Sequence, residues 1–379
     1  GGVLPTPGAP LLVRRYGFEL GIVLSASHNP YRDNGIKFFG GDGFKLSDAD
    51  ELEIERALAT PGADPGGHGI ERRGASDGAG TVGRVHTLDG ALDDYLHALQ
   101  ERFGRLDLSG MRIALDCANG ATHRAAPEIF RRLGADVDVL ADAPDGRNIN
   151  AGCGSTHVEA LAEHVRAGGH DAGFAFDGDG DRVLAVDRHG AVVDGDELIA
   201  LAALHLRSIG RLPGGGVAVT VMTNYGFHTA MQAAGIEVAT TPVGDRYVLE
   251  ALRERDWALG GEQSGHIIDT GFVPSGDGIA AALLTLESLE GGDLAARHAM
   301  EKLPQRLVNV RFADRAALTG AVAAIAGDVE SESVALEGRG RVLVRASGTE
   351  PLVRVMVEAP TTAEADAVSG RLVAAVEAG

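Results

Sequence analysis

Short apolar runs of strand length alternate with stretches of helical periodicity along most of the chain. In residues 112–142 an apolar run ends at Asn-Gly, an amphipathic helix pattern follows, and a second apolar run begins after Leu-Gly-Ala. The same order returns in residues 216–243. Strand, helix and strand in this order need a crossover connection, which joins parallel strands and is right-handed. The pattern therefore predicts an α/β protein with mixed, largely parallel sheets.

The C-terminal part follows a different pattern. Residues 305–313 and 341–359 have the pattern of strands, and residues 363–378 have that of a terminal helix. This order is typical of a small α+β domain with antiparallel strands. Residues 61–83 carry no periodicity, and we expect them to form a mobile surface loop.

These patterns predict four domains. We expect three similar α/β domains at residues 1–88, 89–190 and 191–303, the first of them incomplete, and a smaller α+β domain at residues 304–379. A chain of 379 residues is too long for one hydrophobic core, which agrees with several domains. Residues 1–10 lack a starting methionine and have the pattern of the middle of a domain, which indicates a missing N-terminal segment.

Composition and charge exclude several classes of protein. The 44% apolar and 23% charged residues are ordinary for a soluble globular protein. A net charge of −20 repels nucleic acid, so we expect no nucleic-acid partner. No apolar run approaches the roughly 18–20 residues that span a bilayer, and no secretory signal opens the chain, so we expect no membrane association. The two cysteines, Cys117 and Cys153, exclude a disulfide scaffold and fit a reducing cytoplasm.

The segment Phe-Ala-Phe-Asp-Gly-Asp-Gly-Asp-Arg (residues 174–182) places Asp177, Asp179 and Asp181 at alternating positions after a strand. The intervening glycines let the backbone turn so that the carboxylates converge. Converging carboxylates repel one another without a cation, and hard oxygen ligands suit Mg²⁺. Ligands also bind at the strand ends of α/β sheets. A magnesium site is the favoured interpretation, and a solvated acidic turn is the alternative.

Two other interpretations of this acidic segment fit less well. An EF-hand loop that begins at Asp177 needs glycine at its sixth position and glutamate at its twelfth, where the chain has Arg182 and Arg188. Phosphatases of the haloacid dehalogenase type also carry two aspartates after a strand, but they have threonine or valine where Asp181 stands.

The segment Ser-Ala-Ser-His-Asn-Pro (residues 25–30) follows another apolar run. A serine-hydrolase nucleophile is excluded because no Gly-x-Ser-x-Gly elbow surrounds Ser27 and because, in an extended turn, the side chains of Ser27 and His28 diverge. Asn-Pro is itself a turn signal, so the segment alone indicates a plain turn. A hairpin within residues 31–40, around Asp-Asn-Gly, would return Lys37 to the same loop.

A third polar loop, residues 260–266, offers hydrogen-bonding groups suited to sugar hydroxyls. Its candidate residues are Glu262, Ser264 and His266. As an isolated pattern this is weak, and a plain polar loop is an equally good interpretation.

A fourth loop lies within residues 345–358. Its candidate residues for binding a phosphate are Arg345, Ser347, Gly348, Thr349 and Arg354. The two guanidinium groups can make charge-assisted hydrogen bonds, and the amides after the serine can form an anion nest. The alternative is a strand–turn–strand unit with two surface arginines.

Together the four loops describe phosphoryl transfer on a phosphosugar, since they supply a metal site, a phosphate carrier, a hydroxyl-binding loop and a phosphate clamp. In their order and spacing they resemble the α-D-phosphohexomutase superfamily, and the resemblance covers the whole chain. Residues 146–157, 242–248, 261–266 and 345–358 are most similar to the members that act on glucosamine phosphates for bacterial cell-wall precursor synthesis.

The resemblance implies a reaction and a set of site residues. It implies interconversion of glucosamine 6-phosphate and glucosamine 1-phosphate through a phosphoserine and a 1,6-bisphosphate intermediate, with glucosamine or glucose 1,6-bisphosphate as the phosphorylating activator. Ser27 would carry the phosphoryl group and bind Mg²⁺ together with the three aspartates, and Lys37 and Arg182 would lie beside the reacting phosphate. Ser25 would have only a structural role.

The resemblance also implies four domains around a central cleft in a cytoplasmic enzyme, monomeric or homodimeric, that binds a small phosphosugar. The substrate contacts would be Glu262, Ser264, His266, Arg345, Ser347, Gly348, Thr349 and Arg354. The chain departs from the family at its start, where the N-terminal strand with its Gly-Thr-Asp-Gly motif and an active-site arginine is absent. A phosphomannomutase/phosphoglucomutase of the same superfamily is the closest alternative, and a non-enzymatic protein that binds divalent cations is a remote one.

Overall fold

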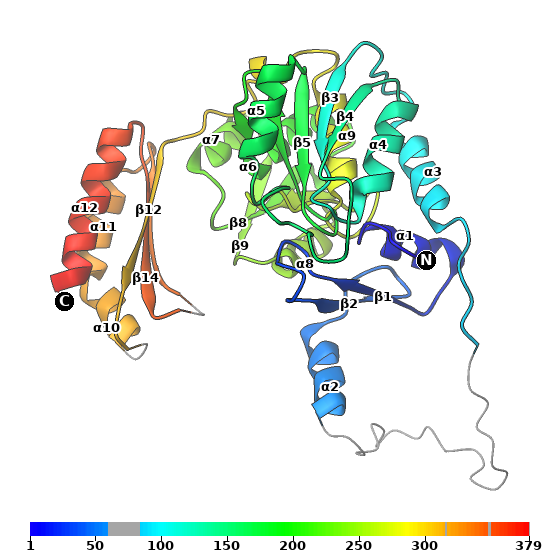
Figure 1. Cartoon of the computed structure of the whole chain (residues 1–379). Helices are drawn as coiled ribbons and strands as arrows, with labels where there is room; N and C mark the ends of the chain where they lie inside the picture. Colours follow the sequence, from blue (N-terminus) through cyan, green and yellow to red (C-terminus); the bar gives the residue numbers. More distant parts are fainter. Residues whose placement is uncertain (60–83, 315–316, 348–349, 379) are drawn as a thin grey trace, which may run out of the picture. The chain divides into compact units, whose positions relative to one another are not determined.

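The computed structural model describes residues 1–59, 84–314, 317–347 and 350–378 (Figure 1). The chain separates into two compact units. Unit 1 comprises Gly1–Val193 and Ser264–Ala295, and unit 2 comprises Asp194–Gln263 and Ala296–Gly379. The segment 61–83, predicted to be a mobile surface loop, lies outside the described residues.

A five-stranded mixed sheet, in the order β4–β3–β5–β6–β7, forms the centre of unit 1. Its strands are β3 (Arg112–Asp116), β4 (Asp136–Leu140), β5 (Ala172–Phe176), β6 (Val183–Asp187) and β7 (Val192–Val193). Strands β4, β3 and β5 are parallel, and β6 and β7 are added antiparallel. The predicted strand–helix–strand unit of residues 112–142 is confirmed, since it forms β3, helix α4 (Thr122–Arg132) and β4.

Helices cover both faces of this sheet, and its inner strands β3 and β5 are correspondingly apolar on both sides, whereas the edge strand β4 alternates polar and apolar residues. On one face α5 (Glu159–Gly168) packs Leu161 against Ala175. On the other face α4 brings the ring of Phe130 to 5.8 Å from that of Phe174. Neighbouring residues of one strand point to opposite faces, so β5 contributes to both cores. Helices α3 (Ala91–Phe103) and α9 (Gly278–Ser288), with the short strand β11 (Ile267–Asp269), complete this part of unit 1.

The N-terminal part of unit 1 is an antiparallel hairpin of β1 (Leu20–Ser25) and β2 (Gly35–Gly40). The predicted hairpin within residues 31–40 is wrong in its position, because residues 26–34 connect the two strands and Lys37 lies opposite Val23. The two apolar runs of equal length pair with each other, and the Asp-Asn-Gly sequence lies at the end of the connection. Helix α1 (Gly8–Tyr16) packs on the hairpin, and α2 (Asp48–Ala59) follows it.

Unit 2 begins with a second strand–helix arrangement. Its strands β8 (Gly216–Thr220), β9 (Glu237–Thr241) and β10 (Leu259–Gly261) are parallel, in the order β10–β8–β9. Its helices are α6 (Gly195–Ser208), α7 (Tyr225–Ala233) and α8 (Asp245–Arg255), and short 3₁₀ turns occur at Pro213–Gly215 in this unit and at Leu294–Ala296. The predicted unit of residues 216–243 is therefore confirmed.

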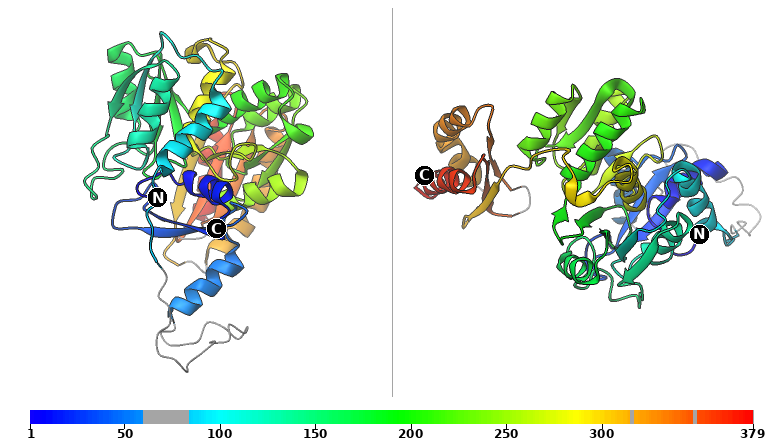
Figure 2. Two further views of the ribbon diagram at one scale, coloured as in Figure 1. Left: turned by 90° about the vertical axis from the view of Figure 1, so that its right-hand side faces the viewer. Right: turned by 90° about the horizontal axis from the view of Figure 1, so that it is seen from above.

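The C-terminal sheet of unit 2 is antiparallel, in the order β12–β14–β13, as predicted. Its strands are β12 (Gln305–Arg311), β13 (Arg341–Ala346) and β14 (Leu352–Glu358), and its helices are α10 (Ala317–Ala324), α11 (Ala326–Ala335) and α12 (Thr362–Ala378). All three helices lie on one face of the sheet (Figure 2), where they cover Val353, Val355 and Val357. The alternate residues of β14 consequently point to the face without helices. Each helix in the described part of the chain is too short or too polar to span a bilayer.

Candidate active site

The loop after β1 holds Ser27 in a left-handed backbone conformation. Its φ angle is 50°, which is uncommon for a residue with a side chain. Hydrogen bonds on both sides stabilise it: the Ser27 amide donates to Ser25 Oγ at 2.8 Å, and Asn150 Nδ2 donates to the Ser27 carbonyl at 2.7 Å. The predicted divergence of Ser27 and His28 is wrong, because Ser27 Oγ lies 3.3 Å from His28 Nδ1. A left-handed turn, in place of the expected extended one, brings the two side chains together.

The loop after β5 brings the three aspartates together, as predicted. Asp177, Asp179 and Asp181 are all buried, and one carboxylate oxygen from each lies within 4.8 Å of the others. The loop begins directly at the end of β5 and returns the chain into β6. The three carboxylates therefore converge at the carboxyl end of a buried strand.

Ser27 and the acidic loop are in direct contact. Ser27 Oγ is 3.3 Å from Asp177 Oδ2, although the two residues are 150 positions apart. A Cβ atom on Gly178 would lie 2.5 Å from the Ser27 carbonyl oxygen, so only glycine permits this approach of the two backbones. The two loops therefore form one site.

Asp179 anchors several elements to this site. Its Oδ2 atom accepts hydrogen bonds from Thr6 Oγ1 at 2.7 Å, Ser25 Oγ at 2.7 Å and Lys37 Nζ at 2.6 Å. Lys37 Nζ also donates to Asp181 Oδ2 at 2.7 Å. The expected return of Lys37 to the loop of residues 25–30 is confirmed, since Lys37 Nζ and Ser25 Oγ donate to the same Asp179 oxygen; the wider hairpin of β1 and β2 brings it there.

The negative charge is divided unequally among the carboxyl groups. Burial, and then the charges of Asp181 and Asp179, raise the pKa of Asp177 well above its ordinary value. Burial also opposes ionisation of Asp181, but the charges of His266 and Lys37 more than offset it and hold its pKa well below the ordinary value. Burial likewise opposes the Lys37 ammonium, yet Asp181 and Asp179 hold the pKa of Lys37 above its ordinary value. Lys37 is therefore a cation at neutral pH.

The donor set of the acidic loop fits a hard divalent cation. Asp179 Oδ1 and Asp181 Oδ1 are buried, and neither has a hydrogen-bond partner among the described residues. A bound cation would favour the ionised form of Asp177 and so complete a set of three carboxylates. Ligand sets made only of oxygen are those that Mg²⁺ prefers. The residues that would hold such an ion are the three aspartates, with an oxygen on Ser27.

Arg182 and His266 lie against the acidic loop. The Arg182 amide donates to Asp177 Oδ1 at 3.1 Å, and its Nε is 3.9 Å from Asp181 Oδ1. His266 is buried, with Nδ1 3.6 Å from Asp181 Oδ1. His266 thus supports the Asp181 carboxylate, and its predicted contact with a sugar stays a prediction.

The other residues of the third predicted loop occupy different surroundings. Glu262 belongs to unit 2, where it is buried and accepts a hydrogen bond from the Gly244 amide at 3.1 Å. Ser264 belongs to unit 1 and is exposed. Their joint role in sugar binding stays a prediction.

The fourth predicted loop places its two arginines side by side. Arg345 on β13 pairs directly with Arg354 on β14. Both side chains are half-buried, and burial, together with the charge of Arg354, lowers the pKa of Arg345. Like charges directly opposite in a sheet destabilise it. The pair therefore suits an anion that would neutralise both guanidinium groups.

The turn beside this arginine pair is closed by Ser347. The Ser347 side chain is buried, and its Oγ accepts a hydrogen bond from the Glu350 amide at 3.2 Å. Gly348 and Thr349, predicted to contribute amides to the phosphate site, lie outside the described residues. Of the five predicted phosphate contacts, the structure therefore brings Arg345 and Arg354 together. Ser347 lies in the turn that joins their two strands.

Besides His28, which lies beside Ser27, three residues of the site have no catalytic or binding role predicted from the sequence. Thr6 and Ser25 donate to Asp179, and Asn150 Nδ2 bonds the carbonyls of both Ser27 and Asn29. Asn150 lies within the family-like segment 146–157, which was the available signal for it. Thr6 is a single polar residue in an apolar segment and carries no such signal.

Family models match the chain along most of its length. The matched descriptions are phosphoglucomutase/phosphomannomutase alpha/beta/alpha domain I at residues 1–63, domain II at 93–190, domain III at 194–307, and the C-terminal domain at 307–375. The predicted class of three α/β domains followed by a smaller one is therefore confirmed. The domain boundaries proposed from the sequence stay predictions.

Curated relatives give the same family, and solved structures share the fold. The chain is 50% identical over 368 residues to a phosphoglucosamine mutase of Desulforudis audaxviator, which covers 94% of this chain and 78% of that protein. A phosphoglucomutase/phosphomannomutase family protein of Burkholderia thailandensis shares the fold with a TM-score of 0.79 at 22% identity, covering 99% of this chain and 82% of that one. An Aspergillus fumigatus N-acetylphosphoglucosamine mutase, solved with GlcNAc-6P and magnesium, has a TM-score of 0.68 at 21% identity, covering 98% and 92%. The chain therefore belongs to the α-D-phosphohexomutase superfamily and, within it, to the phosphoglucosamine mutases.

Proposed function

We propose that the chain interconverts glucosamine 6-phosphate and glucosamine 1-phosphate, with phospho-Ser27 as the phosphoryl donor. The observation that carries this proposal is the 3.3 Å approach of Ser27 Oγ to Asp177 within a buried cluster of three carboxylates. A serine in such surroundings can carry a phosphoryl group only where a cation offsets the negative charge, as phosphoryl transfer requires. The ligands of the Aspergillus fumigatus enzyme, a phosphorylated amino sugar and magnesium, support the same chemical class.

The proposed transfer exchanges one ester bond for another. A hydroxyl group of the bound sugar phosphate attacks the phosphorus of phospho-Ser27, and the bond from phosphorus to Ser27 Oγ breaks. The proton of the attacking hydroxyl ends on Ser27 Oγ, and the product is a bound 1,6-bisphosphate. After the bisphosphate reorients, its other phosphate returns to Ser27 by the reverse exchange.

Residues around Ser27 supply proton transfer and charge. Burial, and then the Arg182 guanidinium, hold the pKa of His28 below its ordinary value, so its neutral ring can relay a proton at Ser27 Oγ, 3.3 Å away. Lys37, as an ammonium ion, and Arg182 would stabilise charge on the phosphoryl oxygens. Bound Mg²⁺, held by the three aspartates, would neutralise further charge on the same oxygens.

Recognition of the rest of the substrate is assigned to two groups of residues. The proposed contacts to sugar hydroxyls are Glu262, Ser264 and His266. The proposed contacts to the non-reacting phosphate are Arg345, Ser347, Gly348, Thr349 and Arg354. A clamp built on paired guanidinium groups binds a phosphate in either orientation of the sugar, which the two half-reactions require.

The proposal also covers the cofactor, the activator, the cellular compartment and the oligomeric state. Its cofactor is Mg²⁺, and glucosamine or glucose 1,6-bisphosphate loads the phosphoryl group onto Ser27. We place the enzyme in the cytoplasm, as a monomer or homodimer.

Ser27→Ala tests the phosphoserine directly. We expect kcat/KM to fall by at least about 10³-fold, and incubation with glucose 1,6-bisphosphate to leave the variant without a phosphate adduct in intact-mass analysis. Ser25→Ala is the matched control, because it removes a hydroxyl two positions away that positions Asp179. It should lower activity but still accept phosphate on Ser27. Mutase activity near wild type in Ser27→Ala would contradict the proposal.

The preferred sugar is tested by turnover of glucosamine, glucose and mannose phosphates under one set of conditions. We expect the highest kcat/KM for glucosamine 6-phosphate. A higher value for mannose or glucose phosphate would move the chain to the phosphomannomutase/phosphoglucomutase alternative without affecting the role of Ser27.

A further inference from the structure

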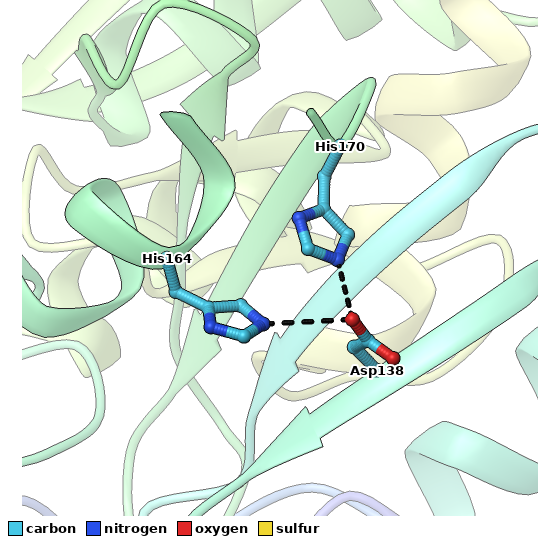
Figure 3. Close-up of side chains that lie close together, drawn as sticks. All are labelled: Asp138, His164 and His170. Carbon is cyan, nitrogen blue, oxygen red and sulfur yellow. Dashed lines mark hydrogen bonds and ion pairs between the residues drawn. The ribbon is translucent and has the colours of Figure 1, made fainter. Parts of the chain in front are cut away.

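Asp138, His164 and His170 form a second cluster of potential metal ligands in unit 1 (Figure 3). Figure 3 shows both imidazole rings directed at one carboxylate oxygen of Asp138. His170 Nε2 lies 2.7 Å and His164 Nε2 3.6 Å from Asp138 Oδ2. One ligating atom from each of the three residues lies within 4.8 Å of the others.

This cluster is separate from the acidic loop. His170 lies just before the first residue of β5, and Asp177 lies just after its last residue, Phe176. Seven residues of extended chain span about 20 Å, so the two clusters lie toward opposite ends of the same strand. The residues of the proposed mutase site therefore do not account for it.

The fold fixes the positions of all three side chains. Asp138 pairs with Ala114 in the sheet, so its side chain lies on the face that α5 covers. His164 is on α5, and His170 follows the end of that helix. A Cβ atom on Gly168 would lie 2.4 Å from His170 Cε1, so the His170 ring rests against the backbone of the helix end. The rings of His164 and His170 lie 4.9 Å apart between centroids.

The chemistry of the three ligands suits a borderline transition metal. In a tetrahedral zinc site with metal–ligand bonds of about 2.0–2.1 Å, neighbouring ligand atoms lie about 3.3 Å apart. The observed separations of 2.7 and 3.6 Å from Asp138 Oδ2 to the two Nε2 atoms bracket this value, so small side-chain movements would suffice. Two imidazoles with one carboxylate select ions such as Zn²⁺ over Mg²⁺, which prefers oxygen ligands.

The exposure of the cluster and a ligand atom without a hydrogen-bond partner in the described part of the chain also favour a cation. The side chains of Asp138 and His164 are 51% and 40% exposed, so the cluster lies at the surface of unit 1, although the His164 Nε2 atom itself is buried. His164 Nε2 has no hydrogen-bond partner among the described residues.

We propose that Asp138, His164 and His170 bind one borderline transition-metal ion such as Zn²⁺, with the fourth coordination position open to water. Bound through Nε2, the His170 ring gives up its hydrogen bond to Asp138, and its remaining ring proton lies on Nδ1. The ion links the edge strand β4 to α5 and to the start of β5, so it stabilises the sheet that ends in the acidic loop.

The test is a Zn²⁺ titration of the full chain in saturating Mg²⁺, which keeps the carboxylates of the acidic loop occupied. We expect one tightly bound Zn²⁺ per chain, a visible absorption spectrum of tetrahedral Co²⁺ when Co²⁺ replaces it, and a rise in Tm with Zn²⁺. His164→Gln should weaken Zn²⁺ binding by at least about 10-fold and abolish the rise in Tm. Because His164 is partly exposed, this variant should fold as the parent does.

His97→Gln is the matched control, since His97 is also an exposed helical histidine near a carboxylate, that of Glu101. It should bind Zn²⁺ as the wild type does, whereas Asp138→Asn should behave as His164→Gln. In nitrogen NMR, Zn²⁺ should move the His170 ring proton to Nδ1. Zn²⁺ affinity weaker than about 0.1 mM in the wild type, or equal affinity in His164→Gln, would overturn the proposal.

Discussion

The acidic loop of unit 1 and the arginine pair of unit 2 differ in how their charges are compensated: the carboxylates bond a cation, whereas the two arginines face each other. In the acidic loop, Lys37 bonds two of the three buried carboxylates at 2.6 and 2.7 Å. In the arginine pair, Arg345 and Arg354 face each other across two strands, and Glu350 lies 3.8 Å from Arg354. Arg354 Nε is buried without a hydrogen-bond partner among the described residues.

The difference shows at which of the two sites groups of the protein itself supply the counter-charge. The carboxylates of the acidic loop receive a counter-charge from Lys37 and hydrogen bonds from Thr6 and Ser25, so other parts of unit 1 set their geometry. In the arginine pair two like charges face each other, so the proposed phosphate would supply a counter-charge that the sheet itself lacks at this position. Removing a charge should therefore have opposite effects on the stability of the free protein at the two sites.

Of the changes to the acidic loop and the arginine pair, Asp179→Asn should have the strongest effect. Asp179 accepts three hydrogen bonds and offers a second, unpartnered oxygen to a cation, so the substitution weakens both the network and the metal site. We expect kcat/KM to fall by about 10³-fold, and the increase in Tm caused by Mg²⁺ to disappear.

Asp142→Asn is the control for this change, because Asp142 is an exposed aspartate of the same unit. It removes one negative charge without touching the acidic loop and should retain wild-type kinetics and the Mg²⁺ effect on Tm. If Asp179→Asn kept its dependence on Mg²⁺, the metal would have to bind elsewhere.

The parts of the fold that the sequence predicts correctly are those with local signals. The β3–α4–β4 and β8–α7–β9 units each lie within about 30 consecutive residues, and their periodicity is visible in the sequence. The convergence of Asp177, Asp179 and Asp181 was predictable for the same reason, since spacing and glycines within one loop produce it. The position of the N-terminal hairpin was not, because the pairing of β1 with β2 depends on which apolar runs meet.

The parts of the site that escaped prediction depend on distant contacts. The proximity of Ser27 and His28 follows from a left-handed φ at Ser27, which Asn150 stabilises from 123 positions away. Thr6 donates to Asp179 across 173 positions. Asp138, His164 and His170 likewise meet only because a strand and a helix pack together. No spacing rule in a single sequence encodes such contacts.

An intermediate effect is expected from Arg345→Gln. The proposed loss of a charge-assisted contact to phosphate should raise KM about 10–100-fold, with a smaller change in kcat, because the contact is made in ground and transition states alike. The same change removes repulsion with Arg354 and should stabilise the free protein by about 0.2–1 kcal/mol in urea unfolding.

Arg306→Gln is the control for the arginine pair, because Arg306 is an exposed residue of the same sheet that pairs with Asp366. It should leave KM unchanged and should not stabilise the protein. A loss of stability in Arg345→Gln would mean that the arginine pair is already neutralised within the free protein, and the contrast with the acidic loop would fail.

The weakest effect concerns Asp196, a buried carboxyl group that, among the described residues, has neither a bonded lysine, as the acidic loop has, nor a like charge opposite it in a sheet, as the arginine pair has. Asp196 in unit 2 accepts a hydrogen bond from the Asn224 amide at 2.9 Å, and burial, with the charge of Asp194, raises its pKa to about 7. The folded protein therefore keeps a proton that the unfolded chain has lost, so this group's contribution to stability decreases as pH rises from about 4 to 7. Asp196→Asn keeps an acceptor for Asn224 but cannot titrate, and it should gain about 1 kcal/mol over the wild type between pH 6 and pH 7 in urea unfolding. Asp256→Asn is the control, because Asp256 is exposed and its left-handed conformation suits asparagine; it should show no such gain. If the difference in unfolding free energy between Asp196→Asn and the wild type did not change with pH, a cation would have to compensate Asp196 as Lys37 compensates the acidic loop.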